Sequence, residues 1–213
     1  MGEIDGFRVS DGDDAAALRQ EVRERSFRVL GQALKTYILC EDSEGLIFID
    51  QHAAHERLVF ERFKKGYETK SLSVNRLLTP VLMECSSEEV LAISDHLEDL
   101  NAMGIEVDPV GKKVFAIRSI PSLIGDEDPR GIIRKIIEEE VSAATRDKTK
   151  GALHPILVAL SCHSAIRANF EMRKEEMEAL VDDLLAQPLS ATCPHGRPIF
   201  FRLLRDDRGN GRN

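Results

Sequence analysis

Tryptophan is absent from the 213-residue sequence, and cysteine is scarce, with four residues. So few cysteines, so scattered, cannot build a disulfide scaffold, and this usage points to a reducing cytosol. Long apolar runs are missing as well, because the longest extends only from Ile156 to Leu160. A membrane-spanning helix needs about 20 apolar residues. We therefore expect a protein with no membrane partner.

Positive charge is in deficit, with 29 Lys and Arg against 37 Asp and Glu, for a net charge of −8. This balance lacks the overall positive field that draws proteins onto nucleic acid, so any action on DNA needs a separate means of recruitment. The motifs G-x-S-x-G, G-x-x-x-x-G-K-[ST] and G-x-G-x-x-G are also absent. Serine hydrolase, P-loop ATPase and dinucleotide-binding functions therefore have no support.

The ends of the chain are polar. We interpret residues 1–26 as a disordered linker remnant and residues 206–213 as a frayed tail. Between them, residues 27–51 hold three short β-rich runs whose short connections predict antiparallel strands. An apolar stripe from Ala53 to Phe63 then predicts a helix that ends near Gly66.

The rest of the chain predicts an α+β fold in two parts. Residues 76–149 show the order β-α-β-β-α, with Ser86 and Glu89 placed as a capping box. Helices are expected at Pro155–Ala168 and Lys174–Gln187, before a last strand. We predict an inner α/β subdomain built from residues 27–75 and 150–205, with residues 76–149 inserted as an outer subdomain.

The first group of candidate site residues surrounds a strand-to-helix junction. Asp50 ends a predicted strand, where its side chain can project beyond the sheet edge. His52 and Glu56 stand four residues apart on the following helix and can hold one metal ion from the same face. His55, three residues after His52, is a competing ligand. The alternative is a helix start with solvated charged residues.

A second group follows from the segment Cys193-Pro194-His195. Proline favours an extended conformation for Cys193, and in extended chain the side chains of residues i and i+2 point the same way. Cys193 and His195 then form a two-ligand clip whose thiolate and imidazole suit zinc. The alternative is a tight Pro/Gly turn with a buried cysteine.

A third candidate is Cys162, next to His163 in an apolar helix, for which a small core residue is the alternative. Cys40 and Cys85 lie in apolar strands, and we assign both to the core. The distant segments together supply a carboxylate-rich half and a thiolate-rich half of one site. Its candidate members are Asp50, His52, Glu56, Cys162, Cys193 and His195.

At these residues the chain resembles the endonuclease-bearing branch of the MutL family of DNA mismatch repair proteins. Asp50 to Glu61 matches that family's D-Q-H-A-x2-E-x4-E signature, and Cys193 to Pro198 matches its C-P-H-G-R-P motif. Ser161 to Ala168 is similar to its central cysteine helix, although His163 stands where arginine is common. Phe200 to Arg202 is similar to its F-x-R motif. The resemblance extends from Phe27 to Arg205.

The resemblance implies a C-terminal region that forms a homodimer and carries a latent, metal-dependent DNA-nicking activity. It implies a structural or regulatory Zn²⁺ and a catalytic Mn²⁺ or Mg²⁺, with ATP acting only through an absent N-terminal domain. Asp50 and Glu56 would be catalytic, and the metal ligands would come from His52, Glu56, Cys162, Cys193 and His195. The rival hypothesis is a zinc-stabilised dimerisation module without catalysis.

The implied partners are a second copy of the chain, DNA bound weakly, the replicative sliding clamp, and the mismatch-recognition protein MutS through the full-length protein. The implied location is the bacterial cytoplasm, at the nucleoid. We expect the inner subdomain to dimerise, through its apolar segments 27–49 and 155–168.

Two further expectations concern contacts to those partners. Arg197 and Arg202 are candidates for a phosphate contact, with a structural ion pair as the alternative. A clamp-binding motif Q-x-L-[LI]-x-P would fall at residues 75–80, where Asn75 replaces Gln and is followed by Leu77, Leu78 and Pro80. The alternative is that both leucines enter the core as part of a strand.

Overall fold

The computed structural model of the chain describes residues 3–4, 7–10, 27–146, 153–165, 170–186 and 190–205. The chain divides into two compact units. Unit 1 consists of Met1–Leu58 and Ala165–Asn213, and unit 2 consists of Val59–Ser164. Within the described residues there are two antiparallel sheets and six α-helices. The predicted α+β class is confirmed.

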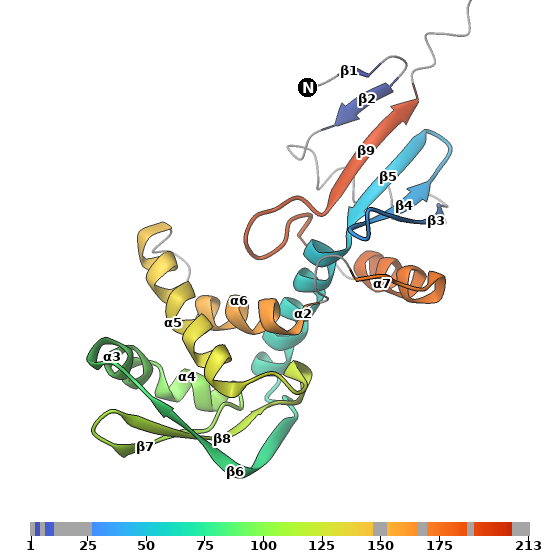
Figure 1. Cartoon of the computed structure of the whole chain (residues 1–213). Coiled ribbons are helices and arrows are strands. Elements are labelled where there is room, and N and C mark those ends of the chain that lie inside the picture. The colour runs from blue at the N-terminus through green and yellow to red at the C-terminus, as the bar shows by residue number, and fades with distance from the viewer. Residues whose placement is uncertain are drawn as a thin grey trace, which may run out of the picture. The chain divides into compact units, whose positions relative to one another are not determined.

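Unit 1 is built on a six-stranded sheet with the order β1-β2-β9-β5-β4-β3 (Figure 1). All neighbours in it pair antiparallel, as predicted for residues 27–51. The strands are β1 (Glu3–Ile4), β2 (Phe7–Ser10), β3 (Arg28–Ala33), β4 (Tyr37–Glu41), β5 (Gly45–Asp50) and β9 (Phe200–Arg205).

Strands β1 and β2 differ from the expected linker at residues 1–26. Phe7 pairs with Arg205 and Ser10 with Arg202, so β2 adds a strand to the edge of β9. An edge strand offers a row of backbone donors and acceptors, and a short segment can pair with that row. The remainder of residues 1–26 and the expected tail, 206–213, lie outside the described residues.

The core of unit 1 lies between this sheet and the helix α7 (Lys174–Ala186). Ile47 and Ile49 of β5 are fully buried, as is Ile38 of β4. Val181 and Leu184 of α7 join the same cluster, on the face that the sequence predicts to be inward. Because side chains alternate along a strand, the burial of Ile47 and Ile49 leaves Asp50 on the other side of β5.

Unit 2 contains a three-stranded sheet with the order β6-β8-β7. Its strands and helices follow the predicted order of residues 76–149 and add neighbouring segments. They are β6 (Val74–Glu84), α3 (Ser87–Asp95), α4 (Leu97–Ala102), β7 (Val107–Gly111), β8 (Val114–Pro121), the short helix η2 (Ser122–Ile124), α5 (Pro129–Arg146) and α6 (Leu153–Ser164).

The predicted capping box is present. The Ser86 hydroxyl accepts from the Glu89 N–H at 3.1 Å, and the Glu89 carboxylate accepts from the Ser86 N–H at 2.7 Å. The single helix expected after Ser86 is instead broken into α3 and α4 at His96. The ring of His96 lies between Asp99 and Glu140 and is only 11% exposed, so this break places an imidazole between α4 and α5.

The unit boundaries differ from the predicted subdomain boundaries. Residues 59–75 and 153–164 group with unit 2 rather than with unit 1. The physical reason is packing, because Phe63 and Leu160 are fully buried in the same core as Ile117 and Ile132. Helix α2 (Gln51–Glu68) therefore starts in unit 1 and ends in unit 2. Its apolar residues contribute to the cores of both units.

The extent of α6 and the composition of the helices bear on two of the sequence predictions. Helix α6 is described from Leu153 to Ser164, and residues 166–169 of the expected helix lie outside the described residues. None of the helices in the described ranges combines the length and the apolar composition that a bilayer crossing requires.

A candidate metal centre

The strand-to-helix junction at Asp50 is held by the chain's own hydrogen bonds. Strand β5 ends at Asp50, and α2 begins at the next residue. The Asp50 Oδ1 atom accepts from the N–H of Ala53 at 2.9 Å, which is the geometry of a helix N-cap. The N–H of Asp50 donates to the Ile199 carbonyl at 2.9 Å. Asp50 thus lies at the end of a strand, as the sequence predicts, and its side chain caps the following helix.

Gln51 is a site-supporting residue that the sequence analysis did not identify. Its side chain is fully buried. Its Nε2 donates to the carbonyls of Lys35 at 2.9 Å and Phe170 at 3.0 Å. These bonds tie the first turn of α2 to the β3–β4 turn and to the segment before α7. In the sequence, only its place as the glutamine of the D-Q-H-A motif could have marked Gln51 as part of the site.

The Cys193 segment forms a narrow hairpin, with an isolated bridge between Thr192 and Pro198. The N–H of Cys193 donates to the Arg197 carbonyl at 2.8 Å, and the N–H of Gly196 donates to the Cys193 carbonyl at 2.9 Å. Gly196 has φ of +87°, a conformation that glycine adopts without the strain of a Cβ atom. The tight Pro/Gly turn with a buried cysteine is present, and the role of Cys193 and His195 as a two-ligand clip stays a prediction. We call residues 191–199 the ligand hairpin.

The ligand hairpin brings Cys193 and His195 to Glu56 of α2. One ligand atom from each of these residues lies within 4.8 Å of the other two. His52 adjoins the group through Glu56, with its Nε2 3.6 Å from Glu56 Oε1. All four residues belong to unit 1, although 139 positions separate Glu56 from His195. Glu56, Cys193 and His195 therefore form a candidate metal site, with His52 beside it.

The electrostatics of this cluster favour a cation. Glu56 is 1% exposed, and Cys193 is equally buried. The His195 Nδ1 atom lies 3.3 and 3.4 Å from the two Glu56 carboxylate oxygens, longer than a strong N–H···O bond of about 2.9 Å. Buried charges are normally paired or coordinate a metal ion. Carboxylate, thiolate and imidazole donors can supply that coordination together.

The other cysteines occupy different environments. Cys40 is fully buried in the core of unit 1, and this burial raises the pKa of its thiol to about 12. Burial, with the charge of Glu89, also raises the pKa of Cys85 in the core of unit 2. Both are core residues, as the sequence indicated. Cys162 lies half-buried on α6 in unit 2, and its place among the ligands stays a prediction.

Arg202 does not have the surroundings expected of a phosphate contact. It is 2% exposed and forms an ion pair with Asp42, whose side chain is itself buried, and it lies 3.5 Å from Glu44. Asp42 also accepts from the backbone of Glu44 and Gly45, so this pair anchors the β4–β5 turn to β9. The structural ion pair is the better interpretation of Arg202. Arg197 is exposed at the tip of the ligand hairpin.

The segment at Asn75 is an irregular part of β6. Arg76 pairs with Ser119 and Val81 with Ile117, so Leu77 to Pro80 bulge out opposite the single residue Arg118. Leu77 packs against the core of unit 2, whereas Leu78 is fully exposed. Leu77 therefore packs against the core, as the alternative of a core strand expects, whereas Leu78 does not.

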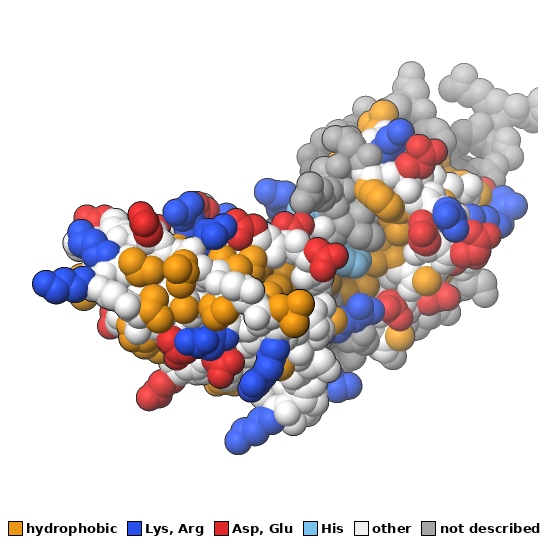
Figure 2. Space-filling view, turned by 60° about the horizontal axis from the view of Figure 1, so that its bottom comes forward, with side chains coloured by type: hydrophobic (Ala, Val, Ile, Leu, Met, Phe, Trp, Pro, Cys, Tyr) orange, Lys and Arg blue, Asp and Glu red, His pale blue; other side chains and the backbone are white. Residues whose placement is uncertain are grey.

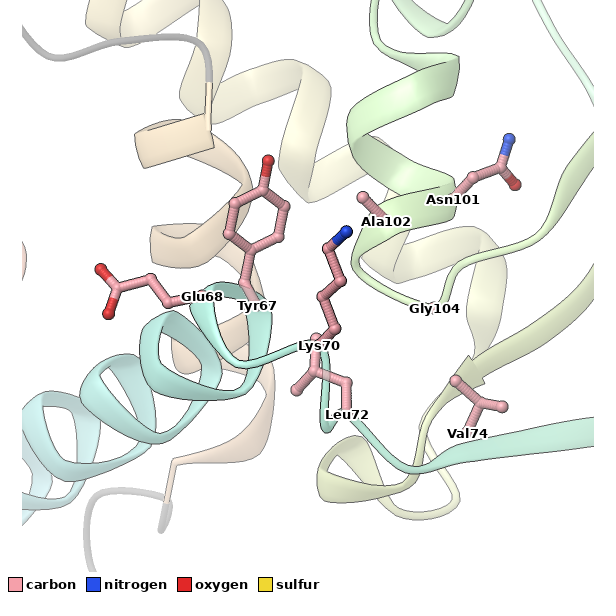
Figure 3. A pocket seen from close by; sticks show the side chains of 8 residues that line it. All are labelled: Tyr67, Glu68, Lys70, Leu72, Val74, Asn101, Ala102 and Gly104. Atoms are coloured by element: carbon pink, nitrogen blue, oxygen red, sulfur yellow. The ribbon is translucent and has the colours of Figure 1, made fainter.

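A separate pocket of about 520 Å³ lies within unit 2. Figure 3 shows Tyr67, at the end of α2, and Lys70, on the turn that follows it, beside Ala102 at the end of α4. Leu72 and Val74 line it from the connection to β6. None of the predicted site residues lines this pocket.

Comparisons with known proteins agree on one family. A family model described as "MutL C terminal dimerisation domain" matches residues 30–173. DNA mismatch repair protein MutL of Bartonella bacilliformis is 33% identical over 195 residues, which cover 90% of this chain and 32% of that protein. The MutL proteins of Syntrophotalea carbinolica and Brucella abortus are also 33% identical, over 83% and 93% of this chain. The chain spans about a third of the length of these relatives.

Replacing Cys193 tests the cluster directly. We expect Cys193→Ser to weaken metal binding at least about tenfold, because a hydroxyl replaces a thiolate ligand. Cys40→Ser is the matched control and should keep the wild-type metal content, because Cys40 lies in the core. Elemental analysis of protein purified without chelators gives the metal content per chain. Equal content in the two variants would refute the assignment.

Proposed function

The chain belongs to the MutL C-terminal dimerisation domain family, and from this membership we propose that it forms a homodimer with a latent, metal-dependent activity that nicks double-stranded DNA in mismatch repair. The observation that carries the proposal is the cluster of buried Glu56 and Cys193 with half-buried His195, next to His52 on the helix that Asp50 caps. A dimerisation surface alone requires no such cluster. ATP hydrolysis and contact with MutS belong, in this proposal, to the part of the protein that precedes this domain.

Zinc is the ion that we propose for the buried half of the site. Two ligands about 2.0–2.1 Å from a tetrahedral zinc ion are separated by roughly 3.3 Å. The His195 Nδ1 to Glu56 Oε1 separation is 3.3 Å, and that from His52 Nε2 is 3.6 Å. Cys193 supplies the soft thiolate that selects zinc over magnesium. Cys162 would complete the set as a further thiolate, on the strength of the family motif.

Asp50 and Glu56 carry the catalytic part of the proposal. A bound Mn²⁺ or Mg²⁺ would supply water activation and charge stabilisation for phosphodiester hydrolysis. Asp50 lies at the end of β5 with one carboxylate oxygen committed to the helix cap and a second available to orient that ion or its water. Arg197, exposed on the ligand hairpin, is the remaining candidate for a phosphate contact.

A zinc-stabilised dimerisation module without catalysis is the second candidate function. The observation that favours it is the N-cap bond from Ala53 to Asp50, because capping alone explains an aspartate at that position. The two functions therefore differ in one property of Asp50, its charge. Asparagine caps a helix about as well as aspartate but carries no charge.

Dimerisation through unit 1 has support in exposed apolar side chains. Leu30 and Leu34 of the β3–β4 hairpin are 45% and 82% exposed, and Phe170 is 52% exposed. Helix α6 does not contribute as expected, because Ile156 to Leu160 are buried in the core of unit 2. We therefore propose that the β3–β4 hairpin and the Phe170 segment form the contact between two copies.

Binding to the replicative sliding clamp is proposed for the bulge in β6. Figure 2 shows hydrophobic side chains gathered on the surface of unit 2, and Leu78 and Leu82 of β6 are among its exposed apolar residues. An exposed leucine on a bulge stiffened by Pro80 can enter a groove at low entropic cost. The Asn75 side chain accepts from the Ser122 hydroxyl at 2.8 Å, which engages the amide that the motif would present.

Recruitment by the clamp also suits the charge of the domain. With a net charge of −8, the domain alone would bind DNA weakly, and a partner would have to hold it there. A place in the bacterial cytoplasm at the nucleoid follows from this proposal.

The charge of Asp50 is the first test. Asp50→Asn should reduce Mn²⁺-dependent nicking of supercoiled plasmid to the level without metal, while the free energy of unfolding changes by less than about 0.5 kcal/mol, because the cap is kept. The assay uses the full-length protein, or this domain fused to a DNA-binding domain. Asp50→Ala should lose nicking and about 1 kcal/mol of stability as well. Full nicking by Asp50→Asn would favour the dimerisation module.

Light scattering tests the dimer. We expect a mass of about twice the 23.8 kDa of one chain at micromolar concentration. Leu34→Asp should weaken dimerisation at least about tenfold, because it buries a charge in an apolar contact. Leu91→Asp, at a 66% exposed position in unit 2, is the matched control and should leave the mass unchanged. A single-chain mass throughout would contradict the proposal.

Titration of the sliding clamp into the domain tests the bulge. We expect micromolar or weaker binding that Asn75→Gln strengthens, because the longer side chain reaches past Ser122. The double change Leu78→Ala/Pro80→Ala should abolish binding. Leu82→Ala, on the same strand outside the motif, should have no effect. The assignment is wrong if Asn75→Gln leaves the affinity unchanged and the double variant still binds.

A further inference from the structure

Arg57 is a buried cation next to a proposed metal ligand. It follows Glu56 on α2 and is 9% exposed. Its Nε–H donates to the carbonyl oxygen of Thr192 at 2.8 Å. A hydrogen bond from an ionised donor is shorter and about twice as strong as a neutral one. This bond joins α2 directly to the ligand hairpin.

Thr192 occupies the point of the hairpin where such a bond has most effect. It forms the isolated bridge with Pro198 at the base of the turn. Cys193 is the next residue, and its N–H and C=O both engage the turn. Because these bonds leave the turn little freedom, the position of the Thr192 carbonyl also determines where Cys193 and His195 lie.

The candidate ligands come from two elements that are far apart in the sequence. His52 and Glu56 lie on α2, and Cys193 and His195 lie on the ligand hairpin. Metal affinity depends on holding ligands near their bonded positions before the ion arrives. Arg57 is placed to do this, since it leaves α2 one residue after Glu56 and reaches the hairpin one residue before Cys193.

We propose that Arg57 is a positioning residue of the metal centre, and that its Nε–H bond to the Thr192 carbonyl holds the hairpin ligands in register with those of α2. The inference rests on the metal centre of the proposed function. It assigns Arg57 no contact with the metal or with DNA. The alternative is that Arg57 only fills space at the junction of α2 and the hairpin.

The two explanations separate in a matched pair of variants. Glutamine places an N–H donor at the position of the arginine Nε, whereas methionine has similar length and no donor. We expect Arg57→Met to weaken Zn²⁺ binding about tenfold in chelator competition, the size typical for loss of a supporting contact. Arg57→Gln should recover most of the affinity. Arg62→Met removes an exposed charge from the same helix and should bind as the wild type does.

Two further measurements separate this inference from the proposed function. The absorption spectrum of the Co²⁺-loaded protein reports the thiolate ligand, and Arg57→Met should lower its charge-transfer band. Amide exchange of Cys193 and Gly196 in metal-free protein should be faster in Arg57→Met and near wild type in Arg57→Gln. Failure of the wild type to bind Zn²⁺ or Co²⁺ would overturn the proposed site. Equal affinity and equal amide exchange in the Met and Gln variants would overturn the role of Arg57.

Discussion

The buried carboxylate of Glu56 is the constraint on which the rest of the site depends. A carboxylate that is 1% exposed is costly unless charge or hydrogen bonds compensate it. Helix α2 puts Glu56 in that position because Asp50 caps its first turn and buried Gln51 fixes its start. The ligand hairpin then places the Cys193 sulfur and the His195 imidazole near the carboxylate. A cation bound among these donors would compensate the buried carboxylate of Glu56 and account for this arrangement.

The same helix links two parts of the molecule. Residues 51–58 of α2 carry the site and belong to unit 1, whereas Phe63 belongs to the core of unit 2. Unit 2 also offers the bulged segment of β6, with Leu78 fully exposed. The proposed clamp contact and the proposed metal centre therefore lie on different units of one chain, and α2 contributes residues to both units.

Local chemistry explains which features were predictable from the sequence. The capping box at Ser86 and Glu89, the inward face of α7 and the closeness of Cys193 to His195 all depend on neighbouring residues, so spacing in the sequence indicated them. The burial of Arg202 with Asp42 and the bond from Arg57 to Thr192 join residues more than a hundred positions apart. No local pattern marks such pairs. The split of α2 between two cores was hidden for the same reason, because its apolar stripe looks continuous.

The location of a bound metal tests the central claim most directly. Crystals of the domain purified without chelators can be measured on both sides of the zinc absorption edge. We predict an anomalous peak within bonding distance of Cys193 Sγ, His195 Nδ1 and a Glu56 carboxylate oxygen. The absence of a peak there, or a peak bound by other residues, would contradict the account.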